Sequence, residues 1–214
     1  VNNLNNQVGK QDLLHFMNTD MSRYVAKLSN EFSIPIFNKI YGPANANRTN
    51  DNRIRMAIQY FIGIGKEAYD TSLSVGEKFY NDTKPSEELD FMMEQYLGFI
   101  LIMVRSVDKN QKLKRMLTFL APYMLKNFLS KYEFTKEGIK EIYNQFQAQH
   151  IKNLKEELQV PYVEGTILTI PYKEACQDKG KTFSTIKSLY WRKWVEKNLS
   201  DWTSKNYLKL RNNI

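Results

Sequence analysis

The sequence predicts an all-α protein, with a multi-helix bundle body and a small basic C-terminal helical module in a helix-turn-helix-like arrangement. Apolar residues recur at spacings of three and four over most of the chain, which is the period of an amphipathic helix. Sustained alternation of apolar and polar residues, the pattern of a half-buried strand, is almost absent. The chain has 214 residues, of which 42% are hydrophobic, so it can bury a core without disulfide or metal support.

The N-terminal part of the body is expected to hold two helices and a short turn. Residues 11–30 place their apolar side chains on one side of a first helix. Residues 33–43 contain two prolines and a glycine and are expected to form a connector. A second helix is expected over residues 53–69, after an Asn-rich loop. Residues 74–77 have the S-x-x-E form of a capping box, although their glycine suits a short turn equally well.

The most apolar stretch of the chain, residues 91–104, predicts the central helix of the bundle. This stretch is apolar on nearly every side, which indicates a helix buried all round. The helix is expected to begin at Pro85 or Ser86, with acidic residues in its first turn.

Two further helices are predicted before the end of the body. The first is expected to be capped by Asp108 and to kink or restart at Pro122. The second is expected to be capped by Thr135 and to run toward Leu158.

Prolines and glycines cluster after residue 160, and the charge of the chain changes there too. The sequence therefore predicts a helical bundle body over residues 1–160, expected to oligomerise, and a basic module over residues 161–214. The one candidate strand in the chain is residues 166–170.

The module is predicted to contain three helices. Residues 171–179 form the first, followed by a glycine turn. The second is expected to be capped by Thr182 or Ser184 and to end at Glu196, and Ser200 is expected to cap the last. The inward side of the second helix is expected to comprise Ile186, Leu189, Tyr190 and Trp194, and its outward side Lys187, Ser188, Trp191, Arg192 and Val195.

The positive charge of the protein is concentrated in this module. The whole chain has a formal charge of +8, and residues 179–214 contain nine lysines or arginines but only two acidic residues. Seven of the eight net positive charges therefore belong to this segment. A near-neutral body with a basic end indicates an anionic partner, of which nucleic acid is the commonest.

The second helix of the module carries the candidate nucleic-acid contacts. In a helix-turn-helix a short first helix braces a second one, whose polar side chains reach the groove. The residues expected near base edges are Thr185, Lys187, Ser188 and Arg192, and those expected at phosphates are Lys181, Lys193 and Lys197. Trp191 is expected to be exposed and to stack on bases, whereas Trp194 and Trp202 are expected in the core. The alternative is a helical hairpin packed on the body, with a solvated basic face.

Catalytic, metal and cofactor chemistry is disfavoured. Residues 63–66 contain Gly-x-Gly-Lys but lack the spacing of a phosphate loop. His15 and His150 have no partner at metal or triad spacing, and Cys176 is expected to be a buried small hydrophobe. The longest apolar run, residues 96–104, is shorter than the roughly 20 residues of a membrane-spanning helix.

Two functions follow as expectations. The first is a non-enzymatic nucleic-acid-binding protein, with DNA favoured over RNA, that also forms a homo-oligomer or larger assembly. The second is a structural assembly protein, such as a virion, nucleocapsid or connector subunit. Neither function needs a cofactor, a small-molecule substrate or a membrane, and the expected location is the cytoplasm or, for a viral protein, the host cytoplasm or the virion.

Overall fold

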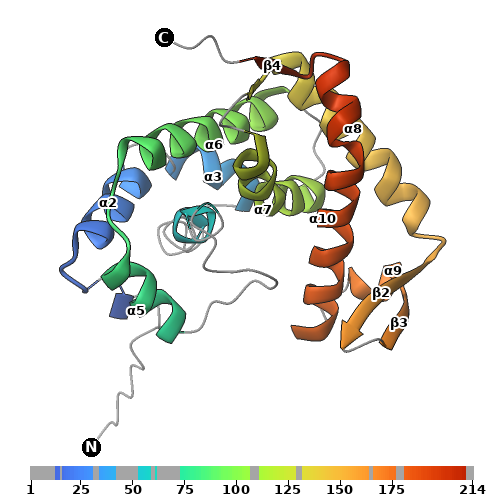
Figure 1. Ribbon diagram of the computed structural model, residues 1–214, viewed down its shortest axis with the longest axis horizontal. Coiled ribbons are helices and arrows are strands. Elements are labelled where there is room, and N and C mark those ends of the chain that lie inside the picture. The colour runs from blue at the N-terminus through green and yellow to red at the C-terminus, as the bar shows by residue number, and fades with distance from the viewer. Residues whose placement is uncertain are drawn as a thin grey trace, which may run out of the picture.

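The computed structural model is mostly helical with short strands, as the sequence predicts (Figure 1). It describes residues 13–14, 16–30, 34–41, 53–58, 61, 73–106, 111–128, 132–163, 166–176 and 181–210. The helices are α2 (Asp20–Leu28), α3 (Ile34–Tyr41), α5 (Leu73–Asp82), α6 (Glu87–Ser106), α7 (Gln111–Phe128), α8 (Lys136–Asn153), α9 (Tyr172–Ala175) and α10 (Lys181–Ser204). The strands are β1 (Tyr132–Phe134), β2 (Glu157–Val163), β3 (Thr166–Pro171) and β4 (Leu208–Leu210).

The N-terminal helices differ in extent from the prediction. The helix expected over residues 11–30 is interrupted, because Thr19 and Ser22 form a reciprocal capping box that starts α2 at Asp20. The segment predicted as a capping box or short turn lies instead within the ten-residue helix α5. Residues 53–58 are helical as expected. The rest of that predicted helix beyond Phe61, together with the Gly-x-Gly-Lys segment, His15 and the Asp108 cap, lies outside the described residues.

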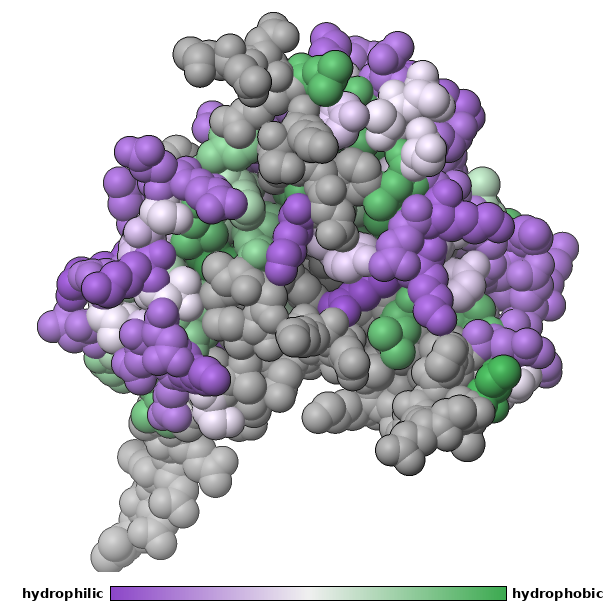
Figure 2. All heavy atoms as spheres, viewed as in Figure 1, coloured by the Kyte–Doolittle hydropathy of each residue, from purple (hydrophilic) through white to green (hydrophobic). Residues whose placement is uncertain are grey.

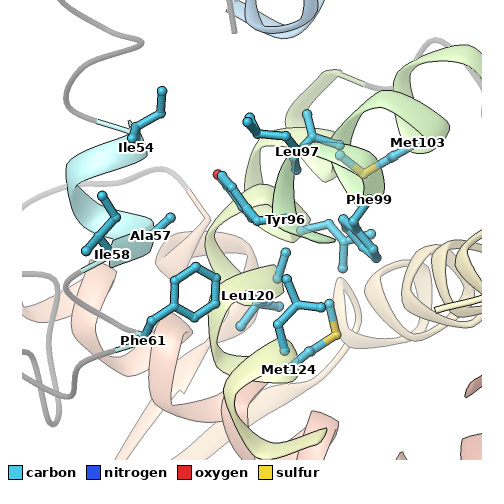
Figure 3. Packing of buried hydrophobic residues seen from close by; sticks show 14 of the residues in the cluster. Ile54, Ala57, Ile58, Phe61, Tyr96, Leu97, Phe99, Met103, Leu120 and Met124 are labelled. Carbon is cyan, nitrogen blue, oxygen red and sulfur yellow. The ribbon is translucent and has the colours of Figure 1, made fainter. Parts of the chain in front are cut away.

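Helix α6 is the hub of the body. It contacts α3, α7, α8 and β1, and its buried side chains meet those of neighbouring helices in a single hydrophobic cluster. Figure 3 shows Tyr96, Phe99 and Met103 of α6 beside Leu120 and Met124 of α7. The acidic residues of its first turn and the Ser86 hydroxyl, which accepts from the Leu89 amide, agree with the predicted start. Helix α7 continues through Pro122 without restarting.

The end of α8 and the hairpin that follows depart from the prediction. Thr135 caps α8 as expected, since its hydroxyl accepts from the Gly138 amide at 2.8 Å. The helix ends at Asn153 rather than near Leu158, because Leu158 is drawn into β2. There Leu158 is the register partner of Ile170, and both are buried. Strand β3 matches the predicted strand, and the sequence boundary near residue 160 falls inside β2.

Helix α10 is one continuous helix of 24 residues, where the sequence predicts two helices separated near Ser200. It ends at Ser204 in a Schellman motif: Tyr207 N–H donates to the Trp202 carbonyl at 3.0 Å, and Asn206 adopts a left-handed φ of 57°. The chain then enters β4, which pairs antiparallel with β1. The sequence predicts neither of these two strands.

The C-terminal strand closes tightly over the start of α8, and Gly138 is the point of closest approach. A Cβ atom built on Gly138 would lie 2.2 Å from the Tyr207 carbonyl oxygen. That oxygen also accepts a hydrogen bond from the Thr135 amide at 3.1 Å. The segment at Tyr207 and the start of α8 therefore cannot move apart without losing this hydrogen bond. We expect Gly138→Ala to lower the free energy of unfolding by about 1–3 kcal/mol.

Gly98 of α6 is the matched control for this substitution. A Cβ atom there would meet nothing within 4 Å, so Gly98→Ala should raise the free energy of unfolding by about 0.5–1 kcal/mol through helix propensity. Urea unfolding of both variants measures the contrast. Equal stability of Gly138→Ala and the wild type would mean that β4 does not close on α8.

Candidate nucleic-acid interface on α10

From residue 189 to its end at Ser204, helix α10 has one buried side and one exposed side. Trp191, Val195 and Trp202 are 1%, 0% and 0% exposed, and their spacings of four and seven place them on one stripe. The opposite stripe consists of exposed residues, which are Lys193, Glu196, Lys197, Ser200 and Ser204. In Figure 2 hydrophilic side chains lie among less polar ones in the region where the upper part of α10 lies in Figure 1. This part of the helix therefore presents a polar outer surface with two lysines and one glutamate.

The predicted exposure of Trp191 is wrong. Its ring packs 4.1 Å from that of Phe146 and 5.2 Å from that of Trp194, measured between centroids. Trp202 belongs to the same aromatic cluster, as predicted, and its Nε1 donates to Gln145 Oε1 at 2.8 Å. Trp194 is half-buried against this core. The indole of Trp191 thus belongs to the packing between α8 and α10 and is not available to stack on a base.

Arg192 also lies inward, contrary to its predicted place on the outer side. Its side chain is 8% exposed, and its guanidinium lies 5.4 Å from the centroid of the Tyr123 ring on α7. The Tyr123 hydroxyl in turn donates to the carboxylate of Glu196. The outward side predicted for this helix is therefore wrong at Trp191, Arg192 and Val195. The physical reason is that α7 and α8 supply aromatic partners on this side.

The two predicted phosphate contacts with described side chains are exposed, as expected. Lys193 and Lys197 lie one helical turn apart on the outer stripe. Lys181, Thr185, Lys187 and Ser188 lie within α10, but their side chains fall outside the described residues. The structure therefore brings Lys193 and Lys197 together and turns Trp191 and Arg192 away from them.

An ion pair distinguishes Lys205 of the basic segment from this pair. Lys205 Nζ lies 2.9 Å from Asp201 Oδ2, which raises the pKa of the exposed Lys205 ammonium. Lys209 is the register partner of Glu133 across the β1–β4 pair. Within the described part of the chain, Lys193 and Lys197 take part in no ion pair. The sequence carries a signal for this difference, because Asp201 lies four residues before Lys205.

A second polar cluster lies beneath α10, around Tyr172. The Tyr172 hydroxyl is 2.6 Å from Nδ1 of His150, and its ring packs against Tyr190 and Trp191. Burial, and after it the hydrogen bond and charge of Cys176, raise the pKa of the Tyr172 hydroxyl far above its usual value near 10. Cys176 is half-buried, less than the sequence predicts. The folded state therefore favours the protonated form of Tyr172.

This shift predicts a loss of stability in alkali. Above a pH of about 10 the unfolded chain releases the Tyr172 proton and the folded chain keeps it, so the free energy of unfolding falls as pH rises. The expected slope for this one group is about 1.4 kcal/mol per pH unit. Tyr172→Phe should remove that slope, whatever constant offset the lost hydroxyl adds. Urea unfolding from pH 9 to 11 measures it, and parallel curves for the two proteins would contradict the assignment.

Among the described residues no group of three histidine, cysteine or carboxylate side chains could hold a metal ion. None of the described helices combines the length and apolar character that a membrane span requires. The chain matches no protein-family model, no curated protein and no solved structure. What it does has to be inferred from its own residues.

Proposed function

We propose that the protein binds nucleic acid, without catalysing a reaction, through the exposed lysine stripe of α10. The observation that carries this proposal is the placement of positive charge. Seven of the eight net charges lie in residues 179–214, and Lys193 and Lys197 stand exposed on the outer side of the helix that runs through this segment.

The two acidic residues of the segment differ in their effect on this stripe. Asp201 pairs with Lys205, whereas Glu196 accepts a hydrogen bond from the neutral Tyr123 hydroxyl of α7 and keeps its negative charge. The outer stripe therefore carries two positive charges and one negative charge, a net charge of +1. Lysine ammonium groups that neutralise phosphates release counterions from a nucleic acid, and this gives affinity at moderate salt.

The proposal does not depend on the predicted helix-turn-helix. That prediction has a first helix over residues 171–179 and a second ending at Glu196, whereas α9 is a four-residue turn of helix ending at Ala175 and α10 runs on to Ser204. The chain between α9 and α10 lies outside the described residues. A single long helix laid along a groove or a backbone would use the same lysines. The helix-turn-helix geometry, and the preference for DNA over RNA, stay predictions.

The test is a binding titration of the full chain against labelled duplex DNA and single-stranded RNA, read by fluorescence anisotropy. Two phosphate contacts on DNA predict that affinity falls about 12-fold or more between 50 and 200 mM salt. No binding to either probe at 50 mM salt would refute the proposal. Truncation at residue 160 is a poor test, because it removes Trp191 and Trp202 from the shared hydrophobic core.

The second candidate function is structural assembly through protein contacts. It is favoured by the large hydrophobic side chains that are exposed in the described part of the chain, which are Leu13 (43%), Phe16 (78%), Ile151 (56%), Leu154 (42%), Ile167 (67%) and Leu210 (70%). This candidate predicts a large ring or filament when the mass of the protein is measured at high concentration. A monomer under those conditions, together with salt-sensitive nucleic-acid binding, would favour the first proposal.

A further inference from the structure

We infer that α10 contacts the phosphodiester backbone and leaves the bases unread, so that binding does not depend on base sequence. This inference rests on the proposed function and specifies its mode. Sequence is read by groups that pair with base edges, of which a bidentate arginine is the commonest, or by aromatic rings that unstack bases. Sequence reading by the described part of α10 therefore requires that such a group is exposed on its outer side.

Three groups of the described part of α10 that could read bases are engaged within the protein. Arg192 lies on the Tyr123 ring and Trp191 against Phe146, both more than nine-tenths buried. The side-chain amide of Asn198 donates to the Trp194 carbonyl at 2.7 Å. None of these three side chains can meet a base edge while α10 stays packed on α7 and α8.

The outer stripe carries chemistry suited to phosphates instead. Lysine ammonium groups act as compact point charges without the planar fork that arginine offers to guanine. Lys193 and Lys197 are separated by a rise of about 6 Å along the helix axis. Two phosphate steps of one strand of duplex DNA rise about 7 Å along the duplex axis, and the flexible lysine stems cover the sideways offset. Each lysine can therefore meet a phosphate of the same strand, a contact that adds affinity without sequence information.

The test is a competition experiment with the full chain bound to a labelled 20-base-pair duplex. The unlabelled competitors are three duplexes of different base composition, a duplex RNA and inorganic polyphosphate. We expect the three DNA duplexes to compete within about twofold of one another and polyphosphate to displace the probe, because backbone charge is what they share. Weaker competition by the duplex RNA than by the DNA duplexes would show that groove geometry contributes to binding in addition to charge.

A selection from a random duplex pool supplies the contrary outcome. Recovery of a sequence bound about 100-fold more tightly than the pool would overturn the inference and leave nucleic-acid binding intact. Absence of any binding would overturn the proposed function itself, so the two failures are distinguishable.

A variant extends the test to the part of α10 whose side chains are not described. Thr185→Ala with Ser188→Ala removes two of the predicted base-contacting side chains from the first half of the helix. We expect this variant to rank the three duplexes as the wild type does. A change in their order would show that these residues read bases, and the inference would then be wrong.

Discussion

Reversing both exposed lysines, by Lys193→Glu with Lys197→Glu, should weaken binding to duplex DNA by at least about 60-fold at 0.1 M salt. Each phosphate contact contributes a factor of about 8 at that concentration relative to 1 M, and two contacts are lost. The salt slope should become shallower by about 2. Anisotropy titrations at four salt concentrations measure both quantities.

The control is the same change of charge on another helix. Lys136 and Lys140 are exposed residues of α8, and Lys136→Glu with Lys140→Glu alters the net charge equally. Affinity should then stay within about threefold of wild type, because only long-range steering is affected. If both double variants lose binding equally, net charge rather than the α10 stripe controls the affinity, and the proposed site is wrong.

Truncating Trp191 to alanine should lower the free energy of unfolding by about 3–5 kcal/mol. The indole is 1% exposed and contacts the rings of Phe146, Trp194, Tyr172 and Tyr190. Its removal leaves a cavity between α8 and α10 that rigid helices cannot close. Urea or guanidinium unfolding at neutral pH measures the loss.

Lys193→Ala, two positions along the same helix, is the matched control. It removes an exposed side chain and should change stability by no more than about 0.5 kcal/mol. A cost below about 1 kcal/mol for Trp191→Ala would place the indole outside the core, and its predicted role in base stacking would have to be reconsidered.

Local signals predicted the helical elements correctly where the chemistry is local. The long apolar run between residues 91 and 104 predicted α6, and the hydroxyl of Thr135 predicted the start of α8. Each depends on residues within one or two turns, so the sequence carries the information directly.

The orientation of α10 could not be predicted in the same way. Tyr190 and Trp194 lie four residues apart on one stripe, and Trp191 lies on the neighbouring stripe, so the aromatic pattern alone does not choose between the two as the buried side. The buried side is determined by contacts of Trp191 with Phe146 of α8 and of Arg192 with Tyr123 of α7. Both partners are far from α10 in sequence. One usable signal was present, since Trp191, Val195 and Trp202 share a stripe at spacings of four and seven.

The short strands were missed for a related reason. In the β1–β4 pair, Tyr132 faces Leu210, and three residues are too few to show alternation. The left-handed Asn206 that turns the chain into β4 is a residue type permitted there, but asparagine is common in this sequence and so marks no single turn.

Lysine footprinting tests the central claim most directly. The full chain is acetylated at limiting reagent with and without a saturating duplex, and the modified lysines are quantified by mass spectrometry. The account predicts that duplex DNA protects Lys193 and Lys197, while Lys136 and Lys140 of α8 react at an unchanged rate. Equal acetylation of Lys193 and Lys197 in the free and DNA-saturated protein would contradict it, because a nucleic acid held on this stripe must cover both ammonium groups.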